Sequence, residues 1–223
     1  MFLYYSHGRD WRHPHAPNND EWGGSARPDY DPPEAAYKYG QDHDLDQYLV
    51  FMKKQIAELL TNYPTVAGIW LDGIAVPIHG DTERFRCQEL YDYIHELSPH
   101  GLVSYKQGLL GTEDFFAPEH GVPGKEDGID KLGKLNDQSN TPIEICTTMI
   151  DDPVSWGYFA GAKHKTAGDV LEKLREAREA GANLLINSGP LPDGSLDSED
   201  ERVLREVGEY LREKGFPGKA NNR

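Results

Sequence analysis

The sequence predicts an α/β protein with a parallel sheet. Short apolar runs of strand length recur along the chain, and amphipathic helical segments separate them. Such alternation is typical of βα units that build a parallel sheet. The chain has 223 residues, enough for a substantial core but short for a complete eight-stranded barrel, which needs about 250. We therefore expect one domain over residues 1–223.

The first half contains three predicted strands and two predicted helices. Apolar runs at Phe2–Ser6, Val66–Leu71 and Gly101–Tyr105 have strand length. Residues 7–40 are irregular and rich in Pro, Gly, His and aromatic side chains, which favours a functional loop. Helical spacing predicts one helix through Leu45, Tyr48, Leu49, Met52, Ile56, Leu59 and Leu60, and another, capped by Asp81, through Phe85, Leu90, Ile94 and Leu97.

The second half continues the alternation after a long loop. Residues 108–140 are expected to be loop-like, with at most a short helix over 129–135. Pro142–Thr147 and Asn183–Asn187 are predicted strands. Thr166 opens a helix that ends before a left-handed Gly181. Ser198 and Glu201 have capping-box spacing for a last helix, which stops at Gly215.

Five predicted strands are too few to close a barrel. An open edge of apolar strands is a template on which another chain can pair. Two architectures follow: an open α/β sheet, or a sheet whose missing strands come from a partner.

Charge and composition exclude several classes of partner. The formal net charge is -15, which disfavours nucleic acid and anionic lipid but suits a neutral substrate such as a sugar. No apolar window approaches the roughly 20 residues of a membrane span. Cys87 and Cys146 cannot form a disulfide framework, so we expect a reduced, cytoplasmic setting.

Carboxylates at strand ends are the first candidate catalytic groups. Asp72 ends the Val66–Leu71 run and Gly73 turns the chain away, the position at which barrel enzymes carry reactive residues. Glu119, with Glu113 as the alternative, lies in the loop after the next strand. A pair of carboxylates on neighbouring loops suits glycoside hydrolysis, in which one attacks the anomeric carbon and the other transfers protons.

Aromatic and histidine side chains accompany these carboxylates. Trp11, Trp70 and Trp156 fall in or beside predicted strand ends, and His7, His13 and His15 occupy the long first loop. Aromatic platforms with histidine and carboxylate hydrogen bonds suit a sugar site, although the tryptophans also suit simple packing against the core. His13 and His15 also have the His-x-His pattern of metal hydrolases, but no further ligand has convincing spacing.

Five motifs together resemble the catalytic domain of the α-L-fucosidases of glycoside hydrolase family 29. They lie in the family's order over nearly the whole chain, and the last two are the most specific. The motifs are Tyr4-Tyr5-Ser6 with Asp10-Trp11; Ile69-Trp70-Leu71-Asp72; Glu144 to Met149 with Ser155-Trp156-Gly157-Tyr158; Gly181 to Asn187; and Gly189-Pro190 with Asp193-Gly194.

The resemblance implies a (β/α) TIM-type barrel and a retaining mechanism without cofactor or metal. Asp72 matches the family's nucleophile, and Glu119 matches one position of the general acid/base. The resemblance also implies a group of sugar-contacting or pocket-wall residues. With the loop candidates included, the expected substrate-binding residues are Tyr5, His7, Trp11, His13, His15, Trp70, Lys106, Glu144 and Trp156.

Three departures from the family leave alternatives open. Family members usually begin with about three further βα units that carry fucose-binding histidines, and this sequence does not contain them. Lys106 stands where an Arg is common in the family, and the family's usual C-terminal β-sandwich is missing. We therefore expect an incomplete barrel of about five parallel strands, completed by a homo-oligomer around a fucosylated substrate. The alternatives are a non-catalytic remnant that binds sugar and a metal-dependent hydrolase using His13 and His15.

Overall fold

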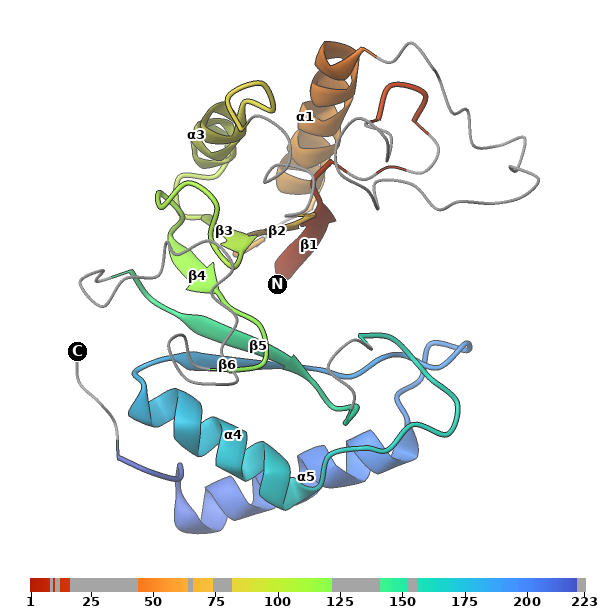
Figure 1. The fold of residues 1–223 in the computed structure, drawn as a ribbon, viewed down its shortest axis with the longest axis vertical. Helices are drawn as coiled ribbons and strands as arrows, with labels where there is room; N and C mark the ends of the chain where they lie inside the picture. Colours follow the sequence, from red (N-terminus) through yellow and green to blue (C-terminus); the bar gives the residue numbers. More distant parts are fainter. Residues whose placement is uncertain are drawn as a thin grey trace. The chain divides into compact units, whose positions relative to one another are not determined.

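The computed structural model describes residues 1–8, 10, 13–16, 44–63, 66–73, 82–121, 141–151 and 156–219. The chain divides into two compact units, Met1–Phe115 (unit 1) and Phe116–Arg223 (unit 2). The described residues contain four helices and six strands, and a helix separates β1 from β2, β2 from β3 and β5 from β6, which confirms the predicted α/β class (Figure 1).

The sheet of unit 1 is parallel across its first three strands. Its elements are β1 (Phe2–Ser6), α1 (Leu45–Asn62), β2 (Gly68–Asp72), α3 (Cys87–Leu97) and β3 (Leu102–Lys106). The strand order is β1-β2-β3-β4, and β4 (Phe115–Ala117) contains the boundary between the two units. Ser6 pairs with Asp72, and Leu71 pairs with Tyr105. This register brings the carboxyl ends of β1, β2 and β3 to the same edge of the sheet.

The core of unit 1 forms where α1 and α3 cover one face of this sheet (Figure 1). All five residues of β2 are buried, as expected for a central parallel strand. The buried face of α1 carries the predicted helical repeat, Leu45, Tyr48, Leu49, Met52 and Ile56. Burying this apolar face stabilises the helix more than its intrinsic propensity does.

Two predictions for unit 1 are corrected. The second helix was predicted to include Phe85, but it begins at Cys87, because Arg86 before it has a left-handed backbone with φ of 50°. Phe85 is buried just before the helix. The predicted cap, Asp81, lies outside the described residues. β4 lies in the segment predicted to be a loop. Its pairing depends on Asp114, whose backbone N–H donates to Val103 O at 2.9 Å and whose Oδ2 accepts from Val103 N at 2.6 Å.

Unit 2 consists of a pair of parallel strands covered by two helices. Its elements are β5 (Glu144–Thr148), α4 (Ala167–Glu179), β6 (Asn183–Asn187) and α5 (Ser198–Lys214). Both helices lie on the same side of the strand pair (Figure 1). Their small core comprises Met149, Val170, Val203 and Val207. The predicted helix over 129–135 lies outside the described residues.

The helix ends of unit 2 match the sequence with one exception. Thr166 and Asp169 form a reciprocal capping box at α4, and Gly181 has φ of 70° just past its end. For α5 the cap is Asp197, not Ser198, because the Asp197 carboxylate accepts from Glu199 N at 2.8 Å. No helix in the described ranges is long and apolar enough to cross a bilayer.

Candidate active site

Asp72 ends β2 at the carboxyl edge of the unit 1 sheet. Asp72 is only 9% exposed to solvent. Gly73 follows with φ of 105°, and a Cβ there would lie 2.1 Å from His7 O, so only glycine fits this turn. The Asp72 carbonyl also accepts a 2.6 Å hydrogen bond from His7 N. The backbone on both sides of Asp72 is therefore fixed.

Three donors surround the Asp72 carboxylate. The Tyr4 hydroxyl donates to Oδ2 over 2.6 Å, and Lys106 Nζ lies 3.5 Å from the same oxygen. Gly73 N donates to Oδ1 over 2.5 Å. Donors to an ionised carboxylate stabilise and orient it. The three donors therefore fix the position of both carboxylate oxygens of Asp72.

An aromatic pair lies beside this carboxylate. The rings of Tyr4 and Trp70 are stacked, with centroids 5.8 Å apart and an interplanar angle of 23°. Tyr4 is 61% exposed, whereas Trp70 is 9% exposed. The pair offers an apolar wall next to three polar donors, a combination typical of small-molecule sites.

Sequence reasoning named Tyr5 and missed Tyr4. Successive side chains of a strand point to opposite faces, so the two tyrosines have different surroundings. The Tyr5 hydroxyl donates to Gln55 Oε1 of α1 at 2.7 Å. Burial, with Asp10 nearby, raises the pKa of Tyr5. Tyr4 is the tyrosine that contacts the candidate nucleophile.

His7 is fully buried in unit 1 rather than facing solvent. Its Nδ1 lies 3.0 Å from the Tyr105 hydroxyl, and its ring contacts Phe85 edge-on with centroids 5.6 Å apart. Burial lowers the pKa of His7 to about 4, so the ring is neutral near pH 7. A neutral, enclosed imidazole here supports the backbone that carries Asp72.

His13 and His15 fasten the first loop to the start of α1. His13 Nδ1 accepts from His15 N at 3.2 Å, and His15 Nδ1 accepts from Asp44 N at 3.0 Å. The His13 ring also stacks on Phe51, with centroids 4.4 Å apart. In the ranges that the structure describes, no group of three or more His, Cys, Asp or Glu could hold a metal ion. Trp11 lies outside the described residues.

Glu119 lies in unit 2, where two backbone bonds anchor it against β5. It forms an isolated parallel bridge with Cys146 and is 7% exposed. Cys146 N donates to Pro118 O at 2.9 Å, and His120 N donates to Cys146 O at 2.8 Å. Glu119 is thus held as rigidly as a strand residue although it belongs to a loop.

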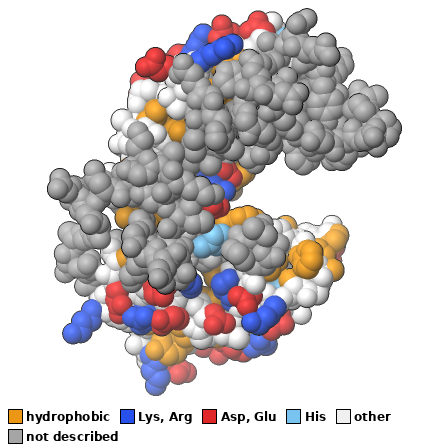
Figure 2. Space-filling view, viewed as in Figure 1, with side chains coloured by type: hydrophobic (Ala, Val, Ile, Leu, Met, Phe, Trp, Pro, Cys, Tyr) orange, Lys and Arg blue, Asp and Glu red, His pale blue; other side chains and the backbone are white. Residues whose placement is uncertain are grey.

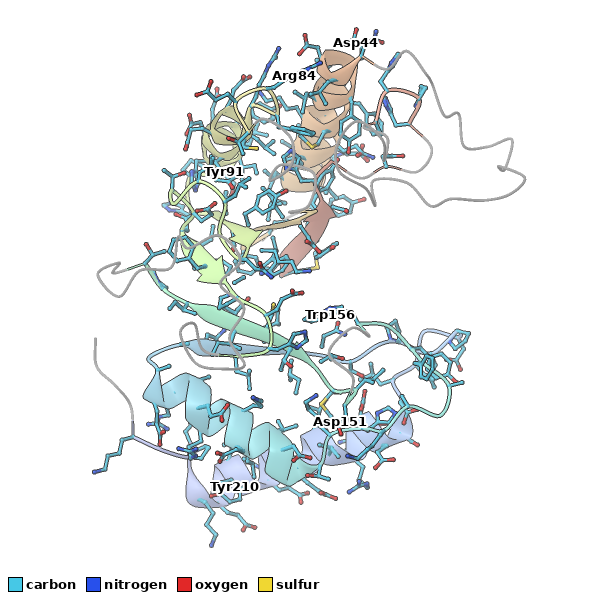
Figure 3. All side chains as sticks on the ribbon, viewed as in Figure 1. Asp44, Arg84, Tyr91, Asp151, Trp156 and Tyr210 are labelled. Atoms are coloured by element: carbon cyan, nitrogen blue, oxygen red, sulfur yellow. The ribbon has the colours of Figure 1, made fainter. Side chains whose placement is uncertain are left out.

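His120 and Trp156 form an aromatic pair next to Glu119. Their ring centroids are 5.2 Å apart, and His120 Nδ1 lies 3.4 Å from Thr147 Oγ1 at the end of β5. Asn187 Nδ2, at the end of β6, donates to Trp156 O at 2.5 Å (Figure 3 labels Trp156). The sequence had already made Trp156 a candidate substrate-binding residue. His120 was not predicted, although its position directly after Glu119 was a usable signal.

Two other predicted acidic residues have different surroundings. Glu144 starts β5, at the strand end opposite Thr148, and accepts from Asn183 Nδ2 at 2.8 Å. Glu113 is buried in unit 1, where it accepts from Leu109 N, Leu110 N, Gly111 N and the Tyr91 hydroxyl. The four donors thus hold the Glu113 carboxylate between its own loop and Tyr91 of α3.

Comparisons with known proteins find α-L-fucosidases. The human (Homo sapiens) plasma alpha-L-fucosidase is 36% identical over 118 residues, which are 52% of this chain and 21% of that protein. The solved alpha-L-fucosidase isoenzyme 1 from Paenibacillus thiaminolyticus is 28% identical, with a TM-score of 0.71 over 99% of this chain and 51% of that one.

A second solved structure shares the fold. Alpha-L-fucosidase AlfC from Lactobacillus casei, in complex with alpha-L-fucose product, is 22% identical with a TM-score of 0.68, covering 95% of this chain and 59% of that chain. The chain therefore spans about a fifth of the curated relative and somewhat over half of these structures. The family model described as Alpha-L-fucosidase matches residues 1–216, and the chain belongs to that family.

Proposed function

We propose that this chain is the catalytic part of a retaining exo-α-L-fucosidase. The observation that carries the proposal is the Asp72 carboxylate, which Tyr4 and Lys106 hold at a strand end beside an aromatic wall. Family membership supports fucoside hydrolysis as the reaction. The net charge of -15 suits a neutral sugar.

In the proposed reaction, Asp72 attacks C1 of a terminal α-L-fucoside. The C1–O bond to the aglycone breaks, and Glu119 in its acid form gives its proton to the departing oxygen. Glu119 then takes a proton from water, the water oxygen attacks C1, and the fucosyl–Asp72 ester bond breaks. Two inversions retain the configuration. This mechanism requires the two carboxyl groups to lie about 5 to 5.5 Å apart in the active assembly.

The aromatic and cationic neighbours have supporting roles in this proposal. Trp70 and Tyr4 form the wall against which the apolar face of fucose packs. Lys106 supplies positive charge without the planar fork of an arginine, so it can stabilise the carboxylate but not bind it bidentately. Tyr4, Lys106 and Gly73 keep Asp72 oriented for attack.

We also propose that identical chains associate to complete a barrel around this site. β1 is an edge strand in the sheet order of the described residues. An exposed parallel edge favours pairing with another chain. His7, His13 and His15 stay predictions as sugar ligands. A cytoplasmic location likewise stays a prediction, compatible with the buried Cys87 and Cys146 thiols.

The test is nitrophenol release from 4-nitrophenyl α-L-fucoside by fractions taken directly from a sizing column. We expect activity in an oligomeric peak of the wild type, and a loss of about three orders of magnitude or more in Asp72→Asn. Proton NMR should show the α-anomer of fucose first. Absence of activity in every peak of a folded wild type would leave the sugar-binding remnant as the better description, and chelator-sensitive activity would indicate the metal hydrolase.

A further inference from the structure

Two consecutive aromatic side chains of unit 2 are exposed on the loop that carries Trp156. Tyr158 is 46% exposed and Phe159 is 61% exposed. They follow Trp156 on the loop between β5 and α4, and hydrophobic side chains gather at this end of unit 2 (Figure 2, right). Isolated exposed apolar residues are ordinary, but adjacent ones next to a candidate site indicate a binding surface.

The backbone under these two rings is fixed. Asn187 Nδ2 donates to Trp156 O, and a Cβ on Gly189 would lie 2.5 Å from Tyr158 N, so the last residue of β6 and the segment after it contact the loop directly. Ala162 N donates to Phe159 O at 3.1 Å. The rings are therefore presented by a backbone that these contacts hold over residues 156–162, and this limits the conformational entropy lost when a ligand packs on them.

Contacts between Asp151 and Lys163 also join the two ends of the same loop. Asp151 N donates to Lys163 O at 2.7 Å, and Lys163 Nζ forms a 2.6 Å ion pair with the Asp151 carboxylate. This pair neutralises two of the charges that flank the loop, and the Tyr158 and Phe159 side chains themselves carry no charge. Two uncharged aromatic rings suit a neutral ligand.

The position relative to Glu119 identifies the part of the substrate that would meet these rings. In the proposed reaction Glu119 protonates the oxygen that joins fucose to its aglycone, so the aglycone starts beside Glu119. His120, the next residue, contacts the Trp156 ring. Phe159 is three residues beyond Trp156, which an extended chain spans in at most about 11 Å.

We propose that Tyr158 and Phe159 form an aglycone platform on which a pyranose next to the fucose stacks. This rests on the proposed fucosidase function and names its substrate class: fucosylated oligosaccharides rather than simple fucosides with a small aglycone. Aromatic rings supply large, rigid contact areas at low entropy cost. The apolar C–H face of a pyranose is complementary to such a surface.

The test compares Phe159→Ala with the wild type on two substrates. α-L-Fucosyl fluoride has no aglycone sugar, whereas a fucosyl disaccharide has one. We expect Phe159→Ala to lower kcat/KM for the disaccharide about 10-fold and to change that for the fluoride less than about 2-fold. The control is Phe216→Ala, because Phe216 is 60% exposed on the same unit but follows α5; it should change neither value.

A binding measurement separates failure of this inference from failure of the proposed function. If the wild type hydrolyses neither substrate, the enzyme proposal fails, and titration calorimetry with L-fucose and the disaccharide still tests the platform. We expect Phe159→Ala to weaken only disaccharide binding. Equal effects on both ligands, no effect, or the same effect in Phe216→Ala would overturn the platform. A changed oligomeric state of Phe159→Ala would instead assign the ring to an interface between copies.

Discussion

The Tyr4 hydroxyl donates a 2.6 Å hydrogen bond to Oδ2 of Asp72, whereas the adjacent Tyr5 hydroxyl donates to Gln55 on the other face of β1. Two chemically identical neighbours thus have separate tasks. Tyr4 orients the candidate nucleophile, and Tyr5 joins the strand to the helix that covers it.

This difference predicts opposite outcomes for two matched variants. Tyr4→Phe removes a donor to the carboxylate, and hydrogen bonds to charged groups contribute about 1.5–3 kcal/mol, so kcat should fall about 10- to 100-fold. Tyr5→Phe should leave kcat within about 2-fold and lower the free energy of unfolding by about 1 kcal/mol. Steady-state kinetics and urea denaturation measure both effects. A larger loss of kcat in Tyr5→Phe would reverse the assignment.

Glu119 and Glu113 should respond differently to replacement by glutamine. Glu119→Gln should keep the free energy of unfolding of the wild type. It should lower kcat/KM for a fucosyl disaccharide about 100- to 10,000-fold, because the departing sugar needs a proton. The first step with nitrophenyl fucoside should be slowed far less, because nitrophenolate is a good leaving group and does not need the proton. Comparison of the two substrates measures this selectivity.

Glu113→Gln should instead be unstable but catalytically ordinary. Its new amide group would face backbone N–H donors, and a buried unsatisfied group costs about 1–3 kcal/mol. The ratio of rates on the two substrates should match the wild type in the folded fraction. A selective loss on the disaccharide in this variant would identify Glu113 as the proton donor.

Acid should destabilise the fold through His7. Burial lowers the pKa of His7 from 6.5 to about 4, so between these values the unfolded chain binds a proton that the folded chain does not. His7 therefore does not lower the free energy of unfolding above pH 6.5. As the pH falls from 6.5 toward 4, the free energy of unfolding decreases by a total of about 3 kcal/mol. Urea denaturation at several pH values should show a shallower pH dependence for His7→Gln; parallel curves would contradict the assignment.

Gly73 should not tolerate alanine, because a Cβ would lie 2.1 Å from His7 O. Gly111 is a matched control: its φ of 85° is also positive, but a Cβ there meets nothing within 4 Å. Gly111→Ala should cost about 1 kcal/mol in backbone strain alone, and Gly73→Ala should cost more and displace Asp72. Thermal unfolding and nitrophenyl fucoside hydrolysis test this; equal melting temperatures would count against a steric role for Gly73.

The elements with strong periodicity were predictable from sequence. α1 buries the residues that its helical spacing marks, and β2 is the apolar run that ends at Asp72. β4 was missed because three residues carry no periodicity, and its pairing depends on the Asp114 side chain bonding to Val103 across the sheet. The α5 cap was misplaced by one residue because Asp197, Ser198 and Glu199 all suit a helix start.

By itself the sequence determined the α/β class and the family resemblance and made Asp72 a candidate nucleophile, because local apolar pattern and residue order carry that information. Only the tertiary structure decided that Tyr4 rather than Tyr5 contacts Asp72, and that Glu113 binds its own loop while Glu119 is anchored to β5. The reason is physical: which face a strand residue occupies, and which donors reach a carboxylate, depend on register and packing between segments far apart in the chain.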